Sequence, residues 1–134
     1  MNRLFSVWIG YDKREQAAYA VARNSLMRNC SDKSVQVRGL FMSDLLYRGL
    51  YKRPTENRGG IMWDLISDAP MSTQHANARF LLPYITATKW AMFCDGDFLW
   101  RADVMELLNS LDDSKALYCV KHRYAPVETK KMDD

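Results

Sequence analysis

The sequence has few of the residues that bind structural zinc. Its 134 residues include three cysteines, Cys30, Cys94 and Cys119, and two histidines, and no Cys-x-x-Cys pair occurs. Structural zinc sites in small domains are built from closely spaced pairs of such ligands, so the pattern argues against one. An odd number of widely spaced cysteines also favours reduced thiols, two of them within apolar stretches, as in a cytoplasmic protein.

Long apolar runs are also missing. No stretch approaches the about 20 apolar residues that cross a bilayer, so no membrane span is expected. The N-terminal sequence MNRLFSVWIG is too short and too interrupted by polar residues for a signal peptide.

Positive charge is present but not concentrated. Nineteen Lys and Arg residues face 16 Asp and Glu residues, which leaves a net charge of +3. No segment interleaves basic and aromatic residues as a nucleic-acid groove does, so no nucleic-acid partner is expected. A few well-placed arginines suit a phosphorylated small molecule instead.

The length and the 48% of hydrophobic residues predict one small globular domain. We place this domain at residues 1–126 and expect a polar, mobile tail at residues 127–134. A homo-oligomer is compatible with this composition.

Strand and helix patterns alternate along the chain. Short apolar runs predict strands at Leu4–Ile9, Val35–Phe41, Trp90–Cys94 and Ala116–Val120. Capping residues predict helices after Asp12, Ser43, Ser72 and Asp103, the third of which is stopped by Pro83. The residues 48–70 are expected to form a long loop with little regular structure. This order predicts an α/β fold, with a mostly parallel sheet, Trp90–Cys94 as its central strand, and helices on both faces.

The sequence Asp95-Gly96-Asp97 ends the apolar strand WAMFC. In open α/β sheets, ligands bind at the carboxyl ends of the strands. Two carboxylates that turn towards one point across a glycine offer hard oxygen ligands to Mg²⁺ or Mn²⁺. An Asp-Gly pair is also an ordinary turn signal, and that reading stays open.

Four segments resemble, in the same order, those of the GT-A fold glycosyltransferases. They are FSVWIGYD, SDAPMSTQHANARFLLP, WAMFCDGDF and LYCVKH. The resemblance is closest to the bacterial and viral relatives of glycosyltransferase family 8, the glycogenin-like enzymes. It implies a Rossmann-like fold that binds a nucleotide-diphospho-sugar, in a truncated or minimal form, and a metal-dependent transfer of the sugar to an acceptor.

The resemblance also implies roles around the Asp-x-Asp motif. Asp95 and Asp97 would hold Mn²⁺, or Mg²⁺, against the diphosphate of a UDP-sugar, with Gly96 between them. Arg79 corresponds to a helix arginine near the sugar or diphosphate, and a surface charge is its alternative. His75, four residues earlier, is expected on the surface or in packing rather than in catalysis.

The end of the first strand would meet the nucleotide base. The residues concerned are Trp8, Ile9, Gly10, Tyr11 and Asp12. Tyr11 would stack on uracil, and Asp12 or the backbone would pair with the edge of the base. The alternative for Asp12 is a helix N-cap.

The sequence departs from the family in length. Members are usually longer, and their later part supplies the acceptor site and a third metal ligand, often a histidine. Here only His122 could take that place, and a structural histidine is its alternative. The alternative function is therefore a non-catalytic donor-binding half. A magnesium-dependent nucleotidyltransferase is less favoured, because WIGYDKR replaces the glycine-rich loop of that class.

Overall fold

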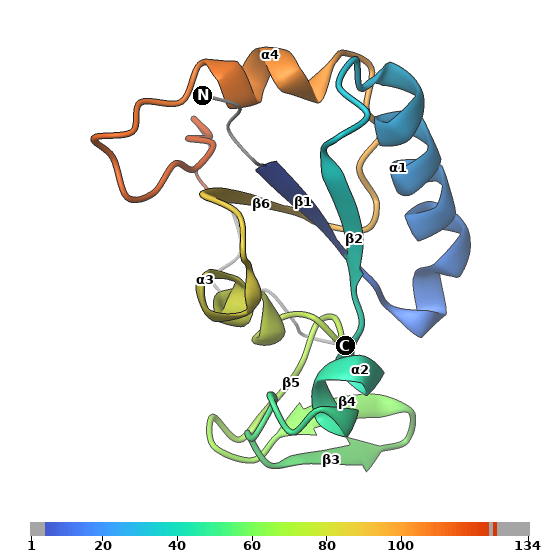
Figure 1. Ribbon diagram of the computed structural model, residues 1–134. Coiled ribbons are helices and arrows are strands. Elements are labelled where there is room, and N and C mark those ends of the chain that lie inside the picture. Colours follow the sequence, from blue (N-terminus) through green and yellow to red (C-terminus); the bar gives the residue numbers. More distant parts are fainter. Residues whose placement is uncertain (1–4, 124, 126–134) are drawn as a thin grey trace.

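The computed structural model describes residues 5–123 and 125. A three-stranded parallel sheet forms its centre (Figure 1). Strand β1 (Phe5–Gly10) lies in the middle, between β2 (Gln36–Leu40) and β6 (Trp90–Cys94). The mixed α/β class and the parallel pairing agree with the prediction. The position of β6 does not, because it was expected at the centre and is an edge strand among the described residues.

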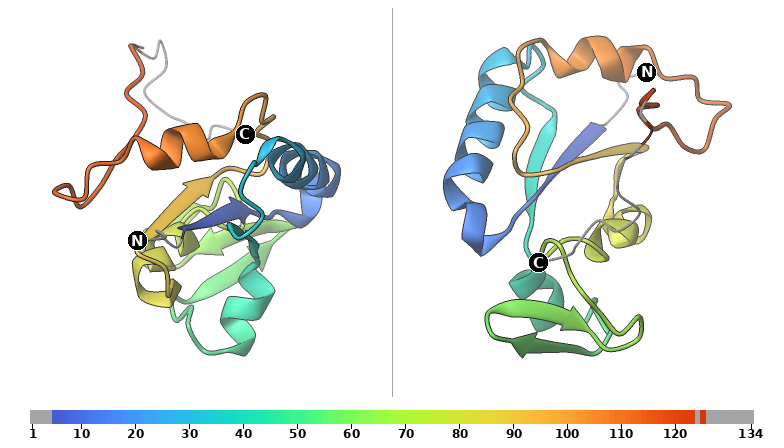
Figure 2. Two further views of the ribbon diagram at one scale, coloured as in Figure 1. Left: turned by 45° about the horizontal axis from the view of Figure 1, so that its top comes forward. Right: turned by 180° about the vertical axis from the view of Figure 1, so that it is seen from behind.

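One face of this sheet is covered by two helices. These are α1 (Gln16–Asn29) and α4 (Val104–Asn109), which lie on the same side of the sheet in Figure 2. Side chains alternate across a strand, so the odd-numbered residues of β1 point to this side. The buried cluster contains Phe5, Val7, Leu26, Cys30, Val104 and Leu108.

The opposite face is covered by shorter elements. They are α2 (Met42–Tyr47), the 3₁₀ turn Ala78–Leu81 and α3 (Leu82–Ile85), which continues from that turn. Their buried side chains surround Trp8 in a cluster that also contains Leu40, Met42, Leu45, Tyr51, Met71, Ala78 and Leu82. The prediction of helices on both faces of the sheet is therefore confirmed (Figure 2).

The segment expected to be a long loop forms a second, antiparallel sheet. Strands β3 (Thr55–Arg58), β4 (Ile61–Asp64) and β5 (Ala69–Pro70) pair in sequence order. Gly59 and Gly60 make the two-residue hairpin turn with φ of 61° and 90°, as a turn with positive φ at both central residues requires. The Gly-Gly pair was the signal for this hairpin in the sequence.

An ion pair between the partly exposed Arg53 and the buried Asp64 links the start of this second sheet to the end of β4. The guanidinium of Arg53 donates to both carboxylate oxygens of Asp64, at 2.8 Å and 2.5 Å. Ser67 donates to the same carboxylate through its backbone N–H at 2.8 Å and through its hydroxyl. These bonds hold the pKa of Asp64 well below its usual range, so the carboxylate is ionised.

Two further predictions of secondary structure were wrong. Residues 72–77 form bends and turns instead of a helix, and Pro83 lies in the first turn of α3 instead of stopping a helix. Proline is tolerated there because the first N–H groups of a helix have no partner within it. Ala116–Val120 is exposed and forms no strand, since no strand in the described part of the chain pairs with it.

The remaining chain-level predictions concern the termini, the cysteines and the membrane. The proposed tail at residues 127–134 lies outside the described residues. All three cysteines lie within the described part, where they are free thiols, Cys30 and Cys94 buried and Cys119 exposed. No helix among the described residues is long and apolar enough to cross a membrane.

Two adjacent leucines of α2 test the assignment of the core around Trp8. Leu45 is 2% exposed within the cluster around Trp8, whereas Leu46 is 47% exposed. Leu45→Ala should lower the free energy of unfolding by about 2–5 kcal/mol because it leaves a cavity, and Leu46→Ala by less than about 1 kcal/mol. Urea unfolding followed by fluorescence measures both values. Equal losses for the two variants would contradict the assigned core.

Candidate functional site

The candidate site lies where β1 and β6 end side by side. The two strands are parallel, with Ile9 opposite Cys94, so both chains leave the sheet at the same edge. The Asp-Gly-Asp turn follows β6 at this edge. Gly96 packs so closely on β1 that a Cβ atom placed there would lie 2.5 Å from the carbonyl oxygen of Gly10. A glycine is required because backbone meets backbone at this point.

Gly10 makes a second close contact, with His75. A Cβ atom on Gly10 would lie 2.6 Å from Nε2 of the imidazole and 2.7 Å from two of its carbons. The His75 ring also packs against Phe93 of β6, with ring centroids 5.6 Å apart. His75 therefore fills the space beside the ends of both strands.

His75 was expected on the surface or in packing, and the structure places it in the packing at the centre of the site. Its side chain is 2% exposed, and Nδ1 lies 3.2 Å from the hydroxyl of Thr73 and 3.9 Å from Oδ1 of Asp95. Burial, together with the charge of Arg79, lowers the pKa of His75, so the imidazole is neutral at pH 7. In the sequence, the spacing of four residues between His75 and Arg79 was the signal that the two side chains lie near each other.

Arg79 and Asp95 come together as the motif suggested. Nη2 of Arg79 lies 3.5 Å from Oδ1 of Asp95, and the guanidinium stacks 4.9 Å from the ring centroid of Phe93. Their side chains are 32% and 48% exposed. Among the described residues, neither Oδ1 of Asp95 nor Nε of Arg79 has a hydrogen-bond partner, although both atoms are buried. Such atoms are costly unless something satisfies them.

Asp97 is exposed and is the last residue of the Asp-Gly-Asp turn. The negative charges of Asp97 and Asp95 act on Cys94 below them, whose pKa is raised to about 12, chiefly by burial. The Cys94 thiol is therefore protonated and is a packing residue rather than a metal ligand or nucleophile.

The oxygen ligands of Asp95 and Asp97 fit a hard divalent cation. No group of three or more His, Cys, Asp or Glu side chains that could hold a metal occurs among the described residues. His122 is exposed in the segment after α4. Asp95 and Asp97 are therefore the side chains at this edge of the sheet whose oxygen atoms suit a cation, and a complete site would need further ligands from substrate and water.

Asp12 is buried and fully engaged at the end of β1. Its Oδ1 accepts from the backbone N–H of Arg14 at 2.9 Å and from Nε of Arg14 at 3.0 Å. Its Oδ2 accepts from Nη2 of Arg14 at 2.8 Å and from the backbone N–H of Gln74 at 3.0 Å. These four bonds use the lone pairs of the carboxylate. Asp12 is therefore a helix N-cap, which was the alternative to pairing with the nucleotide base. The backbone of this turn is then the group left to meet a base.

The other residues proposed to meet the base differ in exposure. Trp8 and Ile9 are buried in the core. Tyr11 is half-buried in an aromatic cluster, with its ring centroid 5.2 Å from that of Tyr19 and 4.7 Å from that of Phe41. Of these three side chains, Tyr11 alone presents partly accessible surface at the strand edge.

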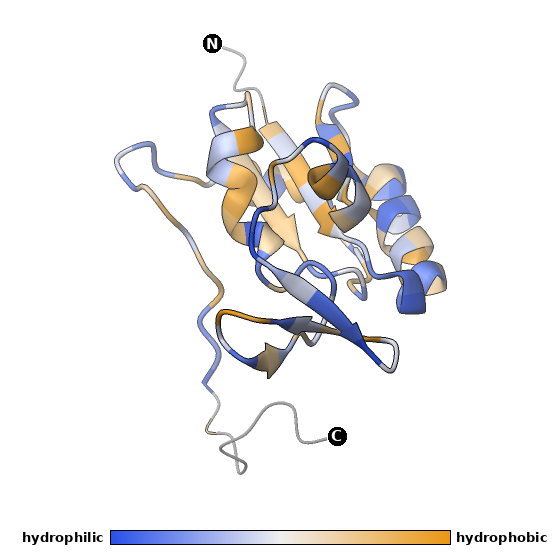
Figure 3. Ribbon diagram, turned by 90° about the horizontal axis from the view of Figure 1, so that it is seen from below, coloured by the Kyte–Doolittle hydropathy of each residue, from blue (hydrophilic) through white to orange (hydrophobic). Residues whose placement is uncertain are grey.

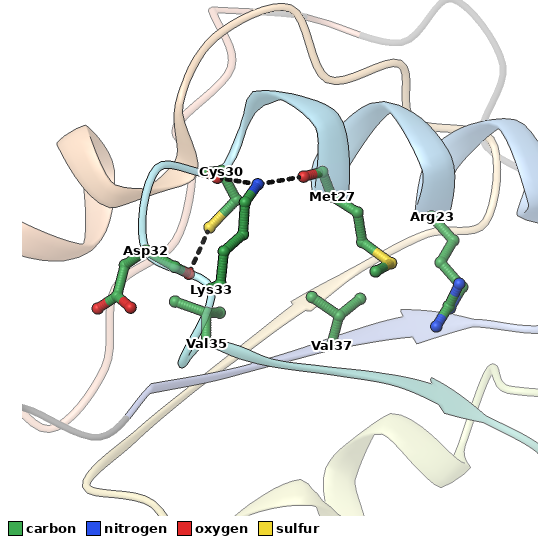
Figure 4. A pocket seen from close by; sticks show the side chains of 7 residues that line it. All are labelled: Arg23, Met27, Cys30, Asp32, Lys33, Val35 and Val37. Carbon is green, nitrogen blue, oxygen red and sulfur yellow. Dashed lines mark hydrogen bonds between the residues drawn. The ribbon is translucent and has the colours of Figure 1, made fainter.

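A pocket of about 240 Å³ lies elsewhere, between the C-terminal half of α1 and β2 (Figure 4). Nζ of Lys33 donates to the carbonyls of Met27 and Cys30 at 2.9 Å and 2.6 Å, which satisfies the end of α1. Burial raises the pKa of the Cys30 thiol. The residues that line the pocket are Arg23, Met27, Cys30, Asp32, Lys33, Val35 and Val37. None of them belongs to the site at the carboxyl ends of β1 and β6.

Comparison with known proteins gives one clear relative and no family. No protein-family model matches the sequence, and no solved structure matches the chain. The chain is similar to Protein CDI of Arabidopsis thaliana, with 40% identity over 130 residues. The match covers 96% of this chain and 45% of that protein. The chain therefore spans less than half of the length of the relative it resembles.

The ionised Asp12 should make stability depend on pH. Arg14 holds the pKa of Asp12 at about 2, below the ordinary 3.8, chiefly through its side-chain hydrogen bonds. The contribution of the ionised Asp12 to the free energy of unfolding is therefore complete above about pH 4 and is lost as the pH falls towards 2. At pH 7, Asp12→Asn should cost about 1.5–3 kcal/mol, since it weakens charge-assisted bonds. Urea midpoints measured from pH 7 to pH 2 should converge for the two proteins at low pH. A constant difference would contradict the assignment.

The contact between Gly96 and Gly10 predicts a steric effect. Gly96→Ala places a methyl group 2.5 Å from the backbone carbonyl of Gly10, so β1 and the turn must move apart. We expect a loss of about 1–3 kcal/mol in the free energy of unfolding. Asp97→Ala, a change at the exposed neighbour, serves as the control and should leave thermal stability nearly unchanged. If Gly96→Ala melts like wild type, the close approach of the two strands is wrong.

Proposed function

We propose that this chain is a metal-dependent glycosyltransferase with a GT-A fold, which binds a UDP-sugar and transfers the sugar to an acceptor. The observation that carries the proposal is the turn at the end of β6. Gly96 fixes this turn against Gly10, and Arg79 lies 3.5 Å from Asp95 with a buried Nε that has no partner among the described residues. A carboxylate beside a guanidinium donor, with a second, exposed carboxylate two residues further on, suits a metal ion and a diphosphate.

Each residue then has a separate task. Asp97, which is exposed, and Asp95 would hold Mn²⁺ or Mg²⁺. When bound, such an ion offsets the charge that develops on a departing nucleoside diphosphate. Arg79 would donate to a phosphate oxygen. The backbone of Gly10 and Tyr11 would face the base, with the partly accessible ring of Tyr11 beside uracil.

Transfer of the sugar would in addition need an acceptor site beside the bound donor. A non-catalytic module that binds the nucleotide-sugar is the second candidate function, favoured because no group of three or more metal-binding side chains occurs among the described residues. Sugar transfer, or slow hydrolysis of a UDP-sugar, separates the two. The proposal includes a cytoplasmic location, where the free thiols of the chain would stay reduced.

The proposal predicts binding of UDP that depends on Mn²⁺ and on Asp97. Isothermal titration of wild type should give tighter binding of UDP with Mn²⁺ than with EDTA, and tighter binding of UDP than of ADP or GDP. Asp97→Asn should weaken the Mn²⁺-dependent binding at least about tenfold, the loss of one charge-assisted contact. Its melting temperature in EDTA should not fall, because two nearby carboxylates repel each other without a cation.

Glu106→Gln is the matched control, since Glu106 is an exposed carboxylate of α4. It should bind UDP as wild type does. An Asp97→Asn protein with full Mn²⁺-dependent UDP affinity and a lower melting temperature in EDTA would instead support a purely structural Asp-Gly turn, and the metal site would be wrong.

A further inference from the structure

Residues 72–77 lack the backbone hydrogen bonds of a regular helix, yet their position decides where Arg79 lies. They form bends and turns that lead into the 3₁₀ turn Ala78–Leu81. A segment of this kind has little intrinsic preference for one conformation, because helical stability requires consecutive hydrogen-bonded turns. Its placement beside β6 must come from contacts with other parts of the chain.

The polar part of these contacts includes three hydrogen bonds from the turn after β1, which add to the packing of His75. The backbone N–H of Gln74 donates to Oδ2 of Asp12 at 3.0 Å. Nη2 of Arg14 donates to the carbonyl of Ser72 at 2.8 Å, and the backbone N–H of Lys13 donates to the side-chain carbonyl of Gln74 at 3.2 Å. The ion pair between Asp12 and Arg14 thus ties two segments that are about 60 residues apart in sequence.

The residues that follow these bonds are the ones at the candidate site. His75 comes directly after Gln74, and its ring lies on Gly10 and Phe93. The backbone N–H of Arg79 donates to the carbonyl of His75 at 3.2 Å. This bond fixes Arg79 one turn later, with its guanidinium over Phe93 and 3.5 Å from Asp95.

We propose that the Asp12–Arg14 ion pair is a positioning element, which anchors residues 72–79 to the end of β1 and so holds Arg79 beside Asp95 for the diphosphate. The inference rests on the proposed function and extends it to residues that do not touch the ligand. Arg14 acts through Ser72 and Asp12 on the segment, and the segment acts on Arg79. His75 packs between the Asp12–Arg14 ion pair and the guanidinium of Arg79, against Gly10 and Phe93.

Arg14→Gln is the variant that tests the anchor. A glutamine cannot form the paired bonds to both oxygens of Asp12 and also reach the carbonyl of Ser72, which a guanidinium does with its fork of donors. Arg23→Gln is the matched control, because Arg23 is an exposed arginine of α1 beside the pocket of Figure 4. Gln74→Ala removes one of the three bonds without touching the ion pair, and so provides a milder variant should Arg14→Gln fail to fold.

The measurement is a double-mutant cycle on the affinity for UDP in the presence of Mn²⁺. Arg79→Ala should weaken binding about 10- to 100-fold, as loss of a charge-assisted contact does. Arg14→Gln should weaken it about 3- to 10-fold, Gln74→Ala less, and Arg23→Gln not at all. The double variant Arg14→Gln/Arg79→Ala should bind like Arg79→Ala alone, because Arg14 acts only through Arg79. Losses that multiply in the double variant, or wild-type affinity in both Arg14→Gln and Gln74→Ala, would overturn the inference.

Amide hydrogen exchange without ligand gives a readout that does not depend on the proposed function. In Arg14→Gln, the amides of residues 74–80 should exchange faster, while those of β1 and the middle of α1 keep their protection. If wild type shows no Mn²⁺-dependent UDP binding, the proposed function fails and the anchor is judged by exchange alone. Faster exchange confined to residues 74–80 would then support the anchor, and unchanged or uniformly faster exchange would overturn it.

Discussion

The close approach of Gly96 to the carbonyl of Gly10 is the contact on which the candidate site depends. A side chain at either position would collide, at Gly96 with backbone and at Gly10 with the ring of His75. The ends of β1 and β6 can therefore come together only because both residues are glycine. This contact brings the Asp-Gly-Asp turn beside the first strand and sets Asp95 next to the segment that carries Arg79. The remaining interactions of the site are arranged around it.

A second constraint is the balance of charge at this edge. Asp12 is neutralised by Arg14, and its carboxylate is saturated with hydrogen bonds, so it is structural. Asp95 is only loosely paired with Arg79, and Asp97 is exposed. One of the three aspartates is thus built into the fold, and the other two remain available to a cation. The number of hydrogen bonds that each carboxylate accepts thus distinguishes the structural Asp12 from the candidate ligands Asp95 and Asp97, which the sequence alone does not.

The sequence predicted the parts of the fold that local patterns determine. Strands β1 and β6 are short apolar runs, and β2 alternates exposed with less exposed residues. Asp12 and Asp103 are N-caps that accept the expected backbone bonds, from Arg14 and Met105. It failed where the outcome depends on distant partners. In the second sheet Arg53 pairs with Asp64, eleven residues away, and residues 116–120 find no strand to pair with in the described part of the chain. For the site, the Asp-x-Asp motif pointed to Asp95 and the resemblance to Arg79, but the burial of His75 and its contact with Gly10 follow from tertiary packing.

A divalent cation bound at the end of β6 by Asp95 and Asp97 would be detected by paramagnetic broadening of amide NMR signals with Mn²⁺ in the presence of UDP. A bound Mn²⁺ erases signals close to it. We expect loss of the signals of residues 95–98 and of Gly10 and Tyr11, at Mn²⁺ concentrations that leave Lys33 and Val35, beside the pocket of Figure 4, unaffected. Broadening that centres on other exposed carboxylates, or that spreads evenly over the surface, would contradict it.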